Sequence, residues 1–122
     1  MIENLVFSGC GTKLYSFLGF LRYLNETHEE FNKNIRSVIG TSAGSFIALL
    51  ICLNYSYNEI EKILINLKIN KFKNIKADNI LNFFDNYGID DGNYFNKVFK
   101  IIVKAKTGNE KTTFKELFEF SN

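Results

Sequence analysis

A serine lies between two glycines in the pattern Gly-x-Ser-x-Gly, which runs from Gly40 to Gly44. A short segment that we expect to form a strand, residues 36–39, precedes this turn, and an unbroken apolar run, residues 46–53, follows it. A sharp turn between a strand and a helix can hold the Ser42 hydroxyl away from the core, where it can attack an ester carbonyl. The same residues could instead form only a tight connection between two core elements, and the motif alone does not decide between these interpretations.

A second glycine-rich turn lies upstream, where Gly9-Cys10-Gly11 follows the apolar segment at residues 5–7. Roughly 30 residues separate the two turns, which is the length of one strand–helix–strand unit. Both strands of such a unit run in the same direction, so the turns that follow them lie at one edge of the sheet. Free N–H groups at a helix N-terminus stabilise negative charge. We therefore expect the Ser42 hydroxyl to lie beside oxyanion-stabilising amides, two of the parts that acyl transfer needs.

Hydrophobic spacing predicts the helices that would position these turns. A helix ending near Asn25 should bury an apolar stripe on one face. The run at 45–53 is apolar on every face, which is typical of a central helix covered on all sides. The first of these stripes consists of Leu14, Phe17, Leu18, Leu21 and Leu24.

The second half of the chain is predicted to be helical. Capping boxes at Ser56-x-x-Glu59 and Thr113-x-x-Glu116 indicate two helix starts. Between them we expect a basic link at 68–76, a short helix at 78–84, and a helix capped by Asp90 or Asp91 that ends before a polar turn at 104–111. That last helix should carry the stripe Phe95, Val98, Phe99 and Ile102. The basic link could contact an anionic membrane, although a solvated connection is the simpler interpretation.

The order strand, helix, strand, helix predicts an α/β fold, with parallel strands and helices packed on the sheet. Two strands alone make a poor core. We therefore expect residues 1–122 to be the N-terminal portion of a single, larger α/β domain, whose last strands lie further along the chain.

Composition limits the classes of function. The 122 residues are 46% hydrophobic and carry a net charge of +2, which supports one compact core and does not indicate nucleic-acid binding. The longest apolar run is too short to span a bilayer. We expect no signal peptide and no disulfide framework, and hence a cytoplasmic protein that could be peripheral at membranes.

Two stretches of sequence resemble the patatin-like phospholipases: "FSGCGTKLYSFLGFLRYL" at 7–24 and "VIGTSAGS" at 38–45. The stretch at 90–121 is similar to a later part of that family. The resemblance implies a three-layer α/β/α fold with a mainly parallel sheet and a Ser–Asp dyad without histidine. It further implies a phospholipid or acylglycerol substrate, no cofactor, no metal and no nucleic acid. It makes Ser42 the nucleophile, Gly40 and Gly44 its supports, Gly9, Cys10 and Gly11 the oxyanion loop, and Lys13 the basic residue of that loop.

The chain departs from the family pattern at several points. Cys10 occupies the middle of a loop that is usually three glycines, but it still offers a backbone N–H. Leu14 stands where a glycine usually follows the basic residue. The catalytic aspartate of the family follows the Thr-Phe-x-x-Leu helix, so we expect it beyond residue 122.

Other residues have simpler interpretations than catalysis. Asp91 precedes a helix and is more typical of a cap than of a dyad aspartate. His28, the one histidine, lies in a polar stretch that is typical of the surface. Cys10 could be a nucleophile, but we favour a backbone donor role. Cys52 is expected in the core, and one histidine with two cysteines provides no zinc ligand set.

Two alternative functions remain open from the sequence. One is an inactive lipid-binding relative of the same fold. The other is a phosphate- or nucleotide-binding α/β module, although the pattern Gly-x-Gly-x-x-Gly fails at Leu14.

Overall fold

The computed structural model describes residues 2–28, 31–68 and 92–121, in two compact units. Unit 1 comprises Met1–Asn66 and Thr112–Asn122, and unit 2 comprises Leu67–Lys111. The short helix expected at 78–84 and nearly all of the basic link lie outside the described residues, as do the predicted caps Asp90 and Asp91.

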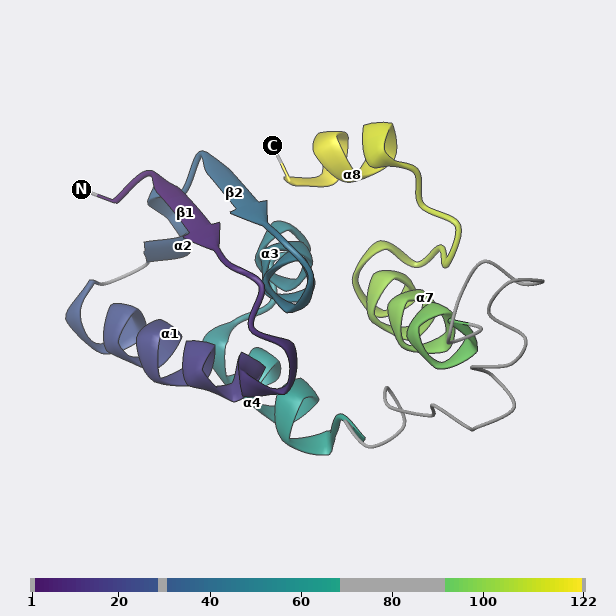
Figure 1. The fold of residues 1–122 in the computed structure, drawn as a ribbon. Helices are drawn as coiled ribbons and strands as arrows, with labels where there is room; N and C mark the ends of the chain where they lie inside the picture. The colour runs from purple at the N-terminus through teal and green to yellow at the C-terminus, as the bar shows by residue number, and fades with distance from the viewer. Residues whose placement is uncertain (1, 29–30, 69–91, 122) are drawn as a thin grey trace. The chain divides into compact units, whose positions relative to one another are not determined.

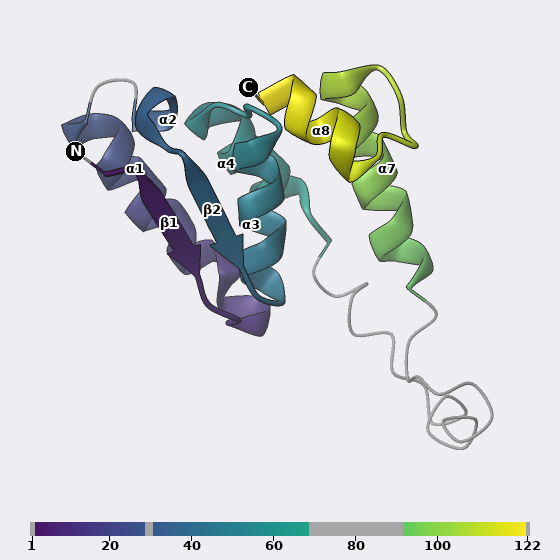
Figure 2. The same ribbon diagram turned by 90° about the horizontal axis from the view of Figure 1, so that it is seen from above.

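Unit 1 is built around a parallel pair of strands, as predicted. Asn4 pairs with Ser37 and Phe7 pairs with Gly40. Figures 1 and 2 show helices α1, α3 and α4 on one side of this pair. In chain order the elements of unit 1 are β1 (Asn4–Phe7), the 3-10 helix η1 (Gly11–Tyr15), α1 (Ser16–Thr27), α2 (Phe31–Asn34), β2 (Ser37–Gly40), α3 (Ala43–Cys52), α4 (Tyr57–Asn66) and α8 (Phe114–Ser121).

Side chains of β1 alternate between the two faces of the strand pair. Leu5 and Phe7 are buried, and Phe7 packs edge-on against Phe17 of α1 with 5.2 Å between ring centroids. On the opposite face Val6 is 72% exposed and Ile39 is 59% exposed. This alternation follows from the two-residue period of a strand with one face covered.

Helix α3 is central to unit 1, as its sequence predicts. It packs against both strands and against η1. Ile47 and Leu50 are completely buried, together with Leu21, Leu24, Ile60 and Leu64 of the neighbouring helices α1 and α4. Burying an aliphatic side chain of this size contributes about 1.5–3 kcal/mol. The core therefore fixes the start of α3, which is where the candidate serine lies.

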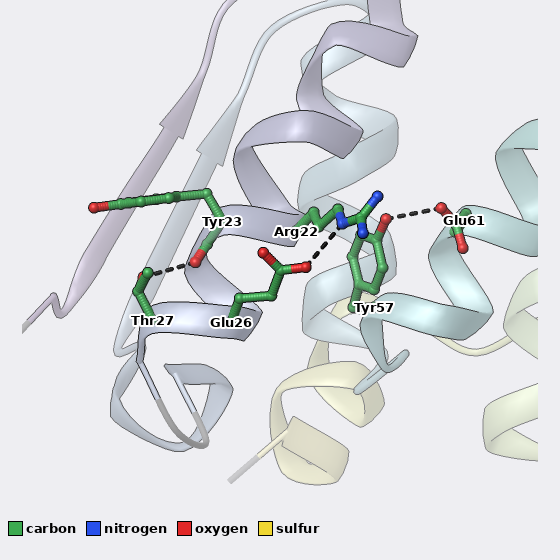
Figure 3. Close-up of polar contacts among 6 residues, drawn as sticks. All are labelled: Arg22, Tyr23, Glu26, Thr27, Tyr57 and Glu61. Carbon is green, nitrogen blue, oxygen red and sulfur yellow. Dashed lines mark hydrogen bonds and ion pairs between the residues drawn. The ribbon is translucent and has the colours of Figure 1, made fainter.

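The first helical segment ends slightly later than the sequence predicts. It starts with the 3-10 turn η1, and α1 extends to Thr27, two residues beyond the expected end at Asn25. Polar contacts are made within this last turn (Figure 3): Arg22 Nε donates to Glu26 Oε1 at 2.8 Å, and the Thr27 hydroxyl donates to the Tyr23 carbonyl at 2.6 Å. Because these residues are polar, apolar spacing did not reveal the extension.

Polar groups of α1 and α4 lie close together on the surface, with each drawn hydrogen bond made within one helix (Figure 3). The Tyr57 hydroxyl donates to Glu61 Oε1 at 2.8 Å. The pKa of Tyr57 is raised, mainly because burial desolvates the hydroxyl and secondly because of this hydrogen bond. The hydrogen bond to Glu26 raises the pKa of the Arg22 guanidinium. These contacts are exposed or only partly buried, so we expect them to add little to stability.

Both predicted capping boxes are confirmed. The Ser56 N–H donates to Glu59 Oε2 at 2.8 Å, and the Thr113 N–H donates to Glu116 Oε2 at 2.7 Å. The bond from the Thr113 backbone is the main reason that the pKa of Glu116 is lowered. Each box satisfies amides that the helix itself leaves unpaired.

In unit 2 the structure describes one helix, α7 (Asn93–Thr107), which lies between two left-handed glycines. Gly92 (φ 67°) occupies the N-cap position, and the N–H of Gly108 (φ 78°) bonds to the Lys104 carbonyl. The expected polar turn from residue 104 was wrong, because the helix continues to Thr107. Lysine and alanine favour helix, and the left-handed glycine after them ends it. None of the helices described is both long and apolar enough to cross a membrane.

Candidate functional site

The parallel register brings the two glycine turns to the same edge of the strand pair. Phe7 and Gly40, the last residues of β1 and β2, are partners. The Thr41 N–H also donates to the Phe7 carbonyl at 3.0 Å, so pairing extends to the first residue of the serine turn. Both turns therefore leave the strands together, as the spacing of one strand–helix–strand unit predicts.

Ser42 occupies the N-cap position of α3 in a backbone conformation that few residues other than glycine adopt. Its φ is 52° and its ψ is −123°. The turn is closed by hydrogen bonds from the Gly44 N–H to the Thr41 carbonyl (2.9 Å) and from the Ser45 N–H to the Ser42 carbonyl (3.0 Å). Such strain costs about 1–3 kcal/mol and persists only where surrounding structure imposes it. The Ser42 residue is exposed at the end of this strained turn.

The two flanking glycines allow backbone segments to approach more closely than any side chain would permit. A Cβ on Gly40 would lie 2.5 Å from the Gly44 carbonyl oxygen and 2.5 Å from Ser45 Cα. A Cβ on Gly44 would lie 2.3 Å from the Phe7 carbonyl oxygen. Gly44 thus lets α3 start directly against the end of β1, and Gly40 lets the chain fold back on that start.

The upstream loop lies against the serine through Gly9. A Cβ on Gly9 would lie 3.3 Å from Ser42 Cβ and 4.0 Å from Ser42 Oγ. Cys10 follows as a half-buried residue, and its carbonyl accepts the Lys13 N–H at 3.1 Å. Gly11 has φ 55°, and a Cβ there would meet no atom within 4 Å. Gly9 is therefore the close neighbour of Ser42, whereas Gly11 turns the chain into η1.

Lys13, which the family resemblance makes the basic residue of the loop, lies in η1 with its side chain exposed. Within the described parts of the chain it forms no ion pair. Lys13 lies three residues before α1 begins at Ser16, and a cation close to a helix N-terminus is electrostatically unfavourable.

One backbone donor at this edge was missed by the sequence analysis. Ala43, the first residue of α3, directly follows Ser42, and its N–H donates to no protein acceptor in the described structure. An amide at this position, one residue after a nucleophile, contributes to oxyanion holes in strand–turn–helix sites. A helix that starts directly after Ser42, inside the motif, leaves this N–H without a partner in the helix.

The remaining predicted residues lie away from Ser42 or have structural roles. His28 is exposed at the C-terminal end of α1, with its Nδ1 2.8 Å from the Thr27 hydroxyl. Cys52 ends α3 half-buried rather than enclosed in the core, and burial raises the pKa of its thiol. No carboxylate or imidazole hydrogen-bonds to the Ser42 hydroxyl among residues 2–28, 31–68 and 92–121. Within those ranges no three His, Cys, Asp or Glu residues gather into a metal site.

Comparison with known proteins identifies the family of this chain. The family model described as "Patatin-like phospholipase" matches residues 5–121. A protein of Acanthamoeba polyphaga mimivirus, "Uncharacterized protein R571", is 25% identical over 116 residues, which cover 95% of this chain and 39% of that protein. The chain therefore spans less than half of the length of this relative. No solved structure matches the chain. Because the family match takes in both glycine turns and every described helix, the chain belongs to the patatin-like phospholipase family.

Proposed function

We propose that Ser42 is the nucleophile of a carboxylic ester hydrolase that acts on phospholipids or acylglycerols. The observation that carries the proposal is the position of Ser42: strained, exposed, and beside Gly9, whose Cβ would lie 4.0 Å from the Ser42 oxygen. A turn that only connects a strand to a helix does not require an exposed serine in a strained backbone conformation, and such strain is concentrated at functional sites. Membership of a phospholipase family supports a lipid ester as the substrate.

In this proposal the Ser42 oxygen attacks the acyl carbonyl carbon and forms a tetrahedral intermediate. The amides of Gly9, Cys10 and Gly11 would face the resulting oxyanion, with the Ala43 N–H and the dipole of α3 adding positive potential. Loss of one such donor typically costs about 10²–10³ in rate. Collapse of the intermediate releases the alcohol and leaves an acyl group on Ser42, which water then hydrolyses.

The attack also requires a base for the Ser42 proton. By family resemblance we assign this role to an aspartate beyond residue 122, in a longer protein. That carboxylate would take the hydroxyl proton during attack and return it to the leaving alkoxide. Gly40, Gly44 and Lys13 would support the site without touching the reacting bond.

Fluorophosphonate labelling of the full-length protein tests the assignment of the nucleophile. The Ser42 oxygen should displace fluoride from phosphorus and leave a stable adduct, which peptide mass spectrometry would locate on Ser42. We expect Ser42→Ala to remain unlabelled and Cys10→Ser, the matched control in the neighbouring loop, to be labelled normally. An adduct on Cys10, or undiminished labelling of Ser42→Ala, would exclude the assignment.

A second candidate function is lipid binding without hydrolysis. It is favoured by one observation: within the described residues the Ser42 hydroxyl has no base beside it. Under this alternative the full-length protein would sediment with phospholipid vesicles but release no fatty acid from them, whereas any release that depends on Ser42 would exclude it.

A further inference from the structure

We propose that one face of α7, formed by Lys97, Lys100 and Lys104, docks the protein on an anionic lipid surface. The choice of a lipid surface rests on the proposed function, because an enzyme that hydrolyses membrane lipids must reach them. We call these three residues the lysine face of α7. No position of α7 relative to the serine site is implied.

Helical spacing and burial define this face. Lys97, Lys100 and Lys104 are three, four and seven residues apart, so they lie on one side of an α-helix. All three are exposed. Ile102 on the opposite side is buried at 4% exposure, and Phe99 is half-buried. Packing of the apolar stripe therefore fixes the direction in which the lysines project.

Charge is concentrated at this helix. Residues 92–111 contain five lysines and one acidic residue, Glu110, whereas the rest of the chain carries more acidic than basic residues. Glu110 lies 3.7 Å from the Lys100 ammonium, and both side chains are more than two-fifths exposed. An exposed pair of this kind neutralises little. A cluster of lysines on an amphipathic helix is a typical site for anionic lipid headgroups, with each lysine worth about 1 kcal/mol near the surface.

An exposed aliphatic residue next to the lysine face favours a membrane over a nucleic acid. Ile101 lies four residues after Lys97 and three before Lys104, and it is 59% exposed. On a bilayer, Ile101 could enter the apolar boundary while the lysine ammonium groups reach the phosphates. Proteins that bind single-stranded nucleic acids instead present aromatic side chains on which the bases stack.

A purely structural role does not account for the whole face. Lysines in the last turn of a helix interact favourably with its dipole, which would explain Lys104 and Lys106. That effect is confined to the last turn, so it explains neither Lys97, in the first half of α7, nor the exposed Ile101.

Vesicle sedimentation tests the proposal, with full-length Ser42→Ala protein so that the lipids stay intact. The triple variant Lys97→Gln, Lys100→Gln, Lys104→Gln is compared with a control that loses three exposed lysines elsewhere: Lys33→Gln, Lys62→Gln, Lys115→Gln. On phosphatidylserine-containing vesicles we expect the first variant to bind about 100-fold more weakly. This loss corresponds to about 3 kcal/mol of binding free energy, because each tenfold change in affinity is about 1.4 kcal/mol. The control, with the same net charge, should lose no more than a few-fold. Ile101→Asn should also weaken binding while keeping its salt dependence.

Three results would overturn the proposal: equal losses in the two triple variants, equal binding to vesicles of phosphatidylcholine alone, or tighter binding to duplex DNA than to anionic vesicles at the same salt. Circular dichroism establishes that each variant is folded. Hydrolysis of a water-soluble short-chain ester separates this proposal from the proposed function. With Ser42 restored, the lysine variant should hydrolyse this soluble ester as fast as the protein with all its lysines. If the protein binds vesicles but hydrolyses no ester, only the proposed function fails.

Discussion

Replacing Ser42 with alanine is expected to lower kcat/KM of the full-length protein for a soluble ester by at least about a thousandfold. The change removes the atom that attacks the carbonyl, and losses of nucleophiles in serine hydrolases are typically this large or larger. The alanine should accept the same backbone conformation at the same cost, so the fold and vesicle binding should be retained. Hydrolysis within tenfold of the unmodified rate would show that another residue performs the attack.

A second substitution at the same position reports on the strain independently of activity. Ser42→Gly should be as inactive as Ser42→Ala but more stable than it by about 1 kcal/mol, because glycine adopts φ 52° without a clash. Urea unfolding of the two variants measures this difference. Equal stability would mean that the serine turn is relaxed, and the argument that this turn exists to present a side chain would lose its main support.

Replacing Gly44 with alanine is expected to destabilise the protein by about 3 kcal/mol or more, or to prevent folding. The added methyl would lie 2.3 Å from the Phe7 carbonyl oxygen and 2.6 Å from that of Ser8, and neither is the end of a flexible side chain. Helix α3 would have to move away from β1, which breaks the packing of the most buried helix. Thermal and urea unfolding give the size of the effect.

Gly19→Ala is the matched control for this substitution. Gly19 lies inside α1, and a Cβ there would meet nothing within 4 Å. Alanine should therefore stabilise the helix by about 0.5–1 kcal/mol through its better propensity. If Gly44→Ala and Gly19→Ala were equally stable, the close approach of α3 to the end of β1 would be contradicted.

The parts of the fold that follow from hydrophobic patterning could be predicted from the sequence. The run at 45–53 is apolar on every side, so a covered helix was the natural interpretation, and α3 is that helix. The end of α7 could not be predicted in the same way. Residues 104–107 are mostly polar, and the helix continues through them until Gly108 takes a left-handed conformation. Apolar periodicity carries no information about such an extension.

Proximity within the candidate site followed from topology, whereas the roles of individual groups did not. One strand–helix–strand unit was enough to predict that Gly9 and Ser42 would be neighbours. The distinct positions of Gly9, against the serine, and Gly11, turning into η1, depend on backbone angles that spacing does not encode. The Ala43 donor was missed because the helix was expected to begin at residue 45, whereas α3 begins at Ala43.

The most direct measurement is a crystal structure of the full-length protein with a fluorophosphonate adduct. We expect phosphorus bonded to Ser42 Oγ, with the phosphoryl oxygen about 2.7–3.1 Å from N–H groups of the Gly9–Gly11 loop. A phosphoryl oxygen directed away from that loop, with none of its amides in hydrogen-bonding range, would show that the serine and the glycine turn do not form one site.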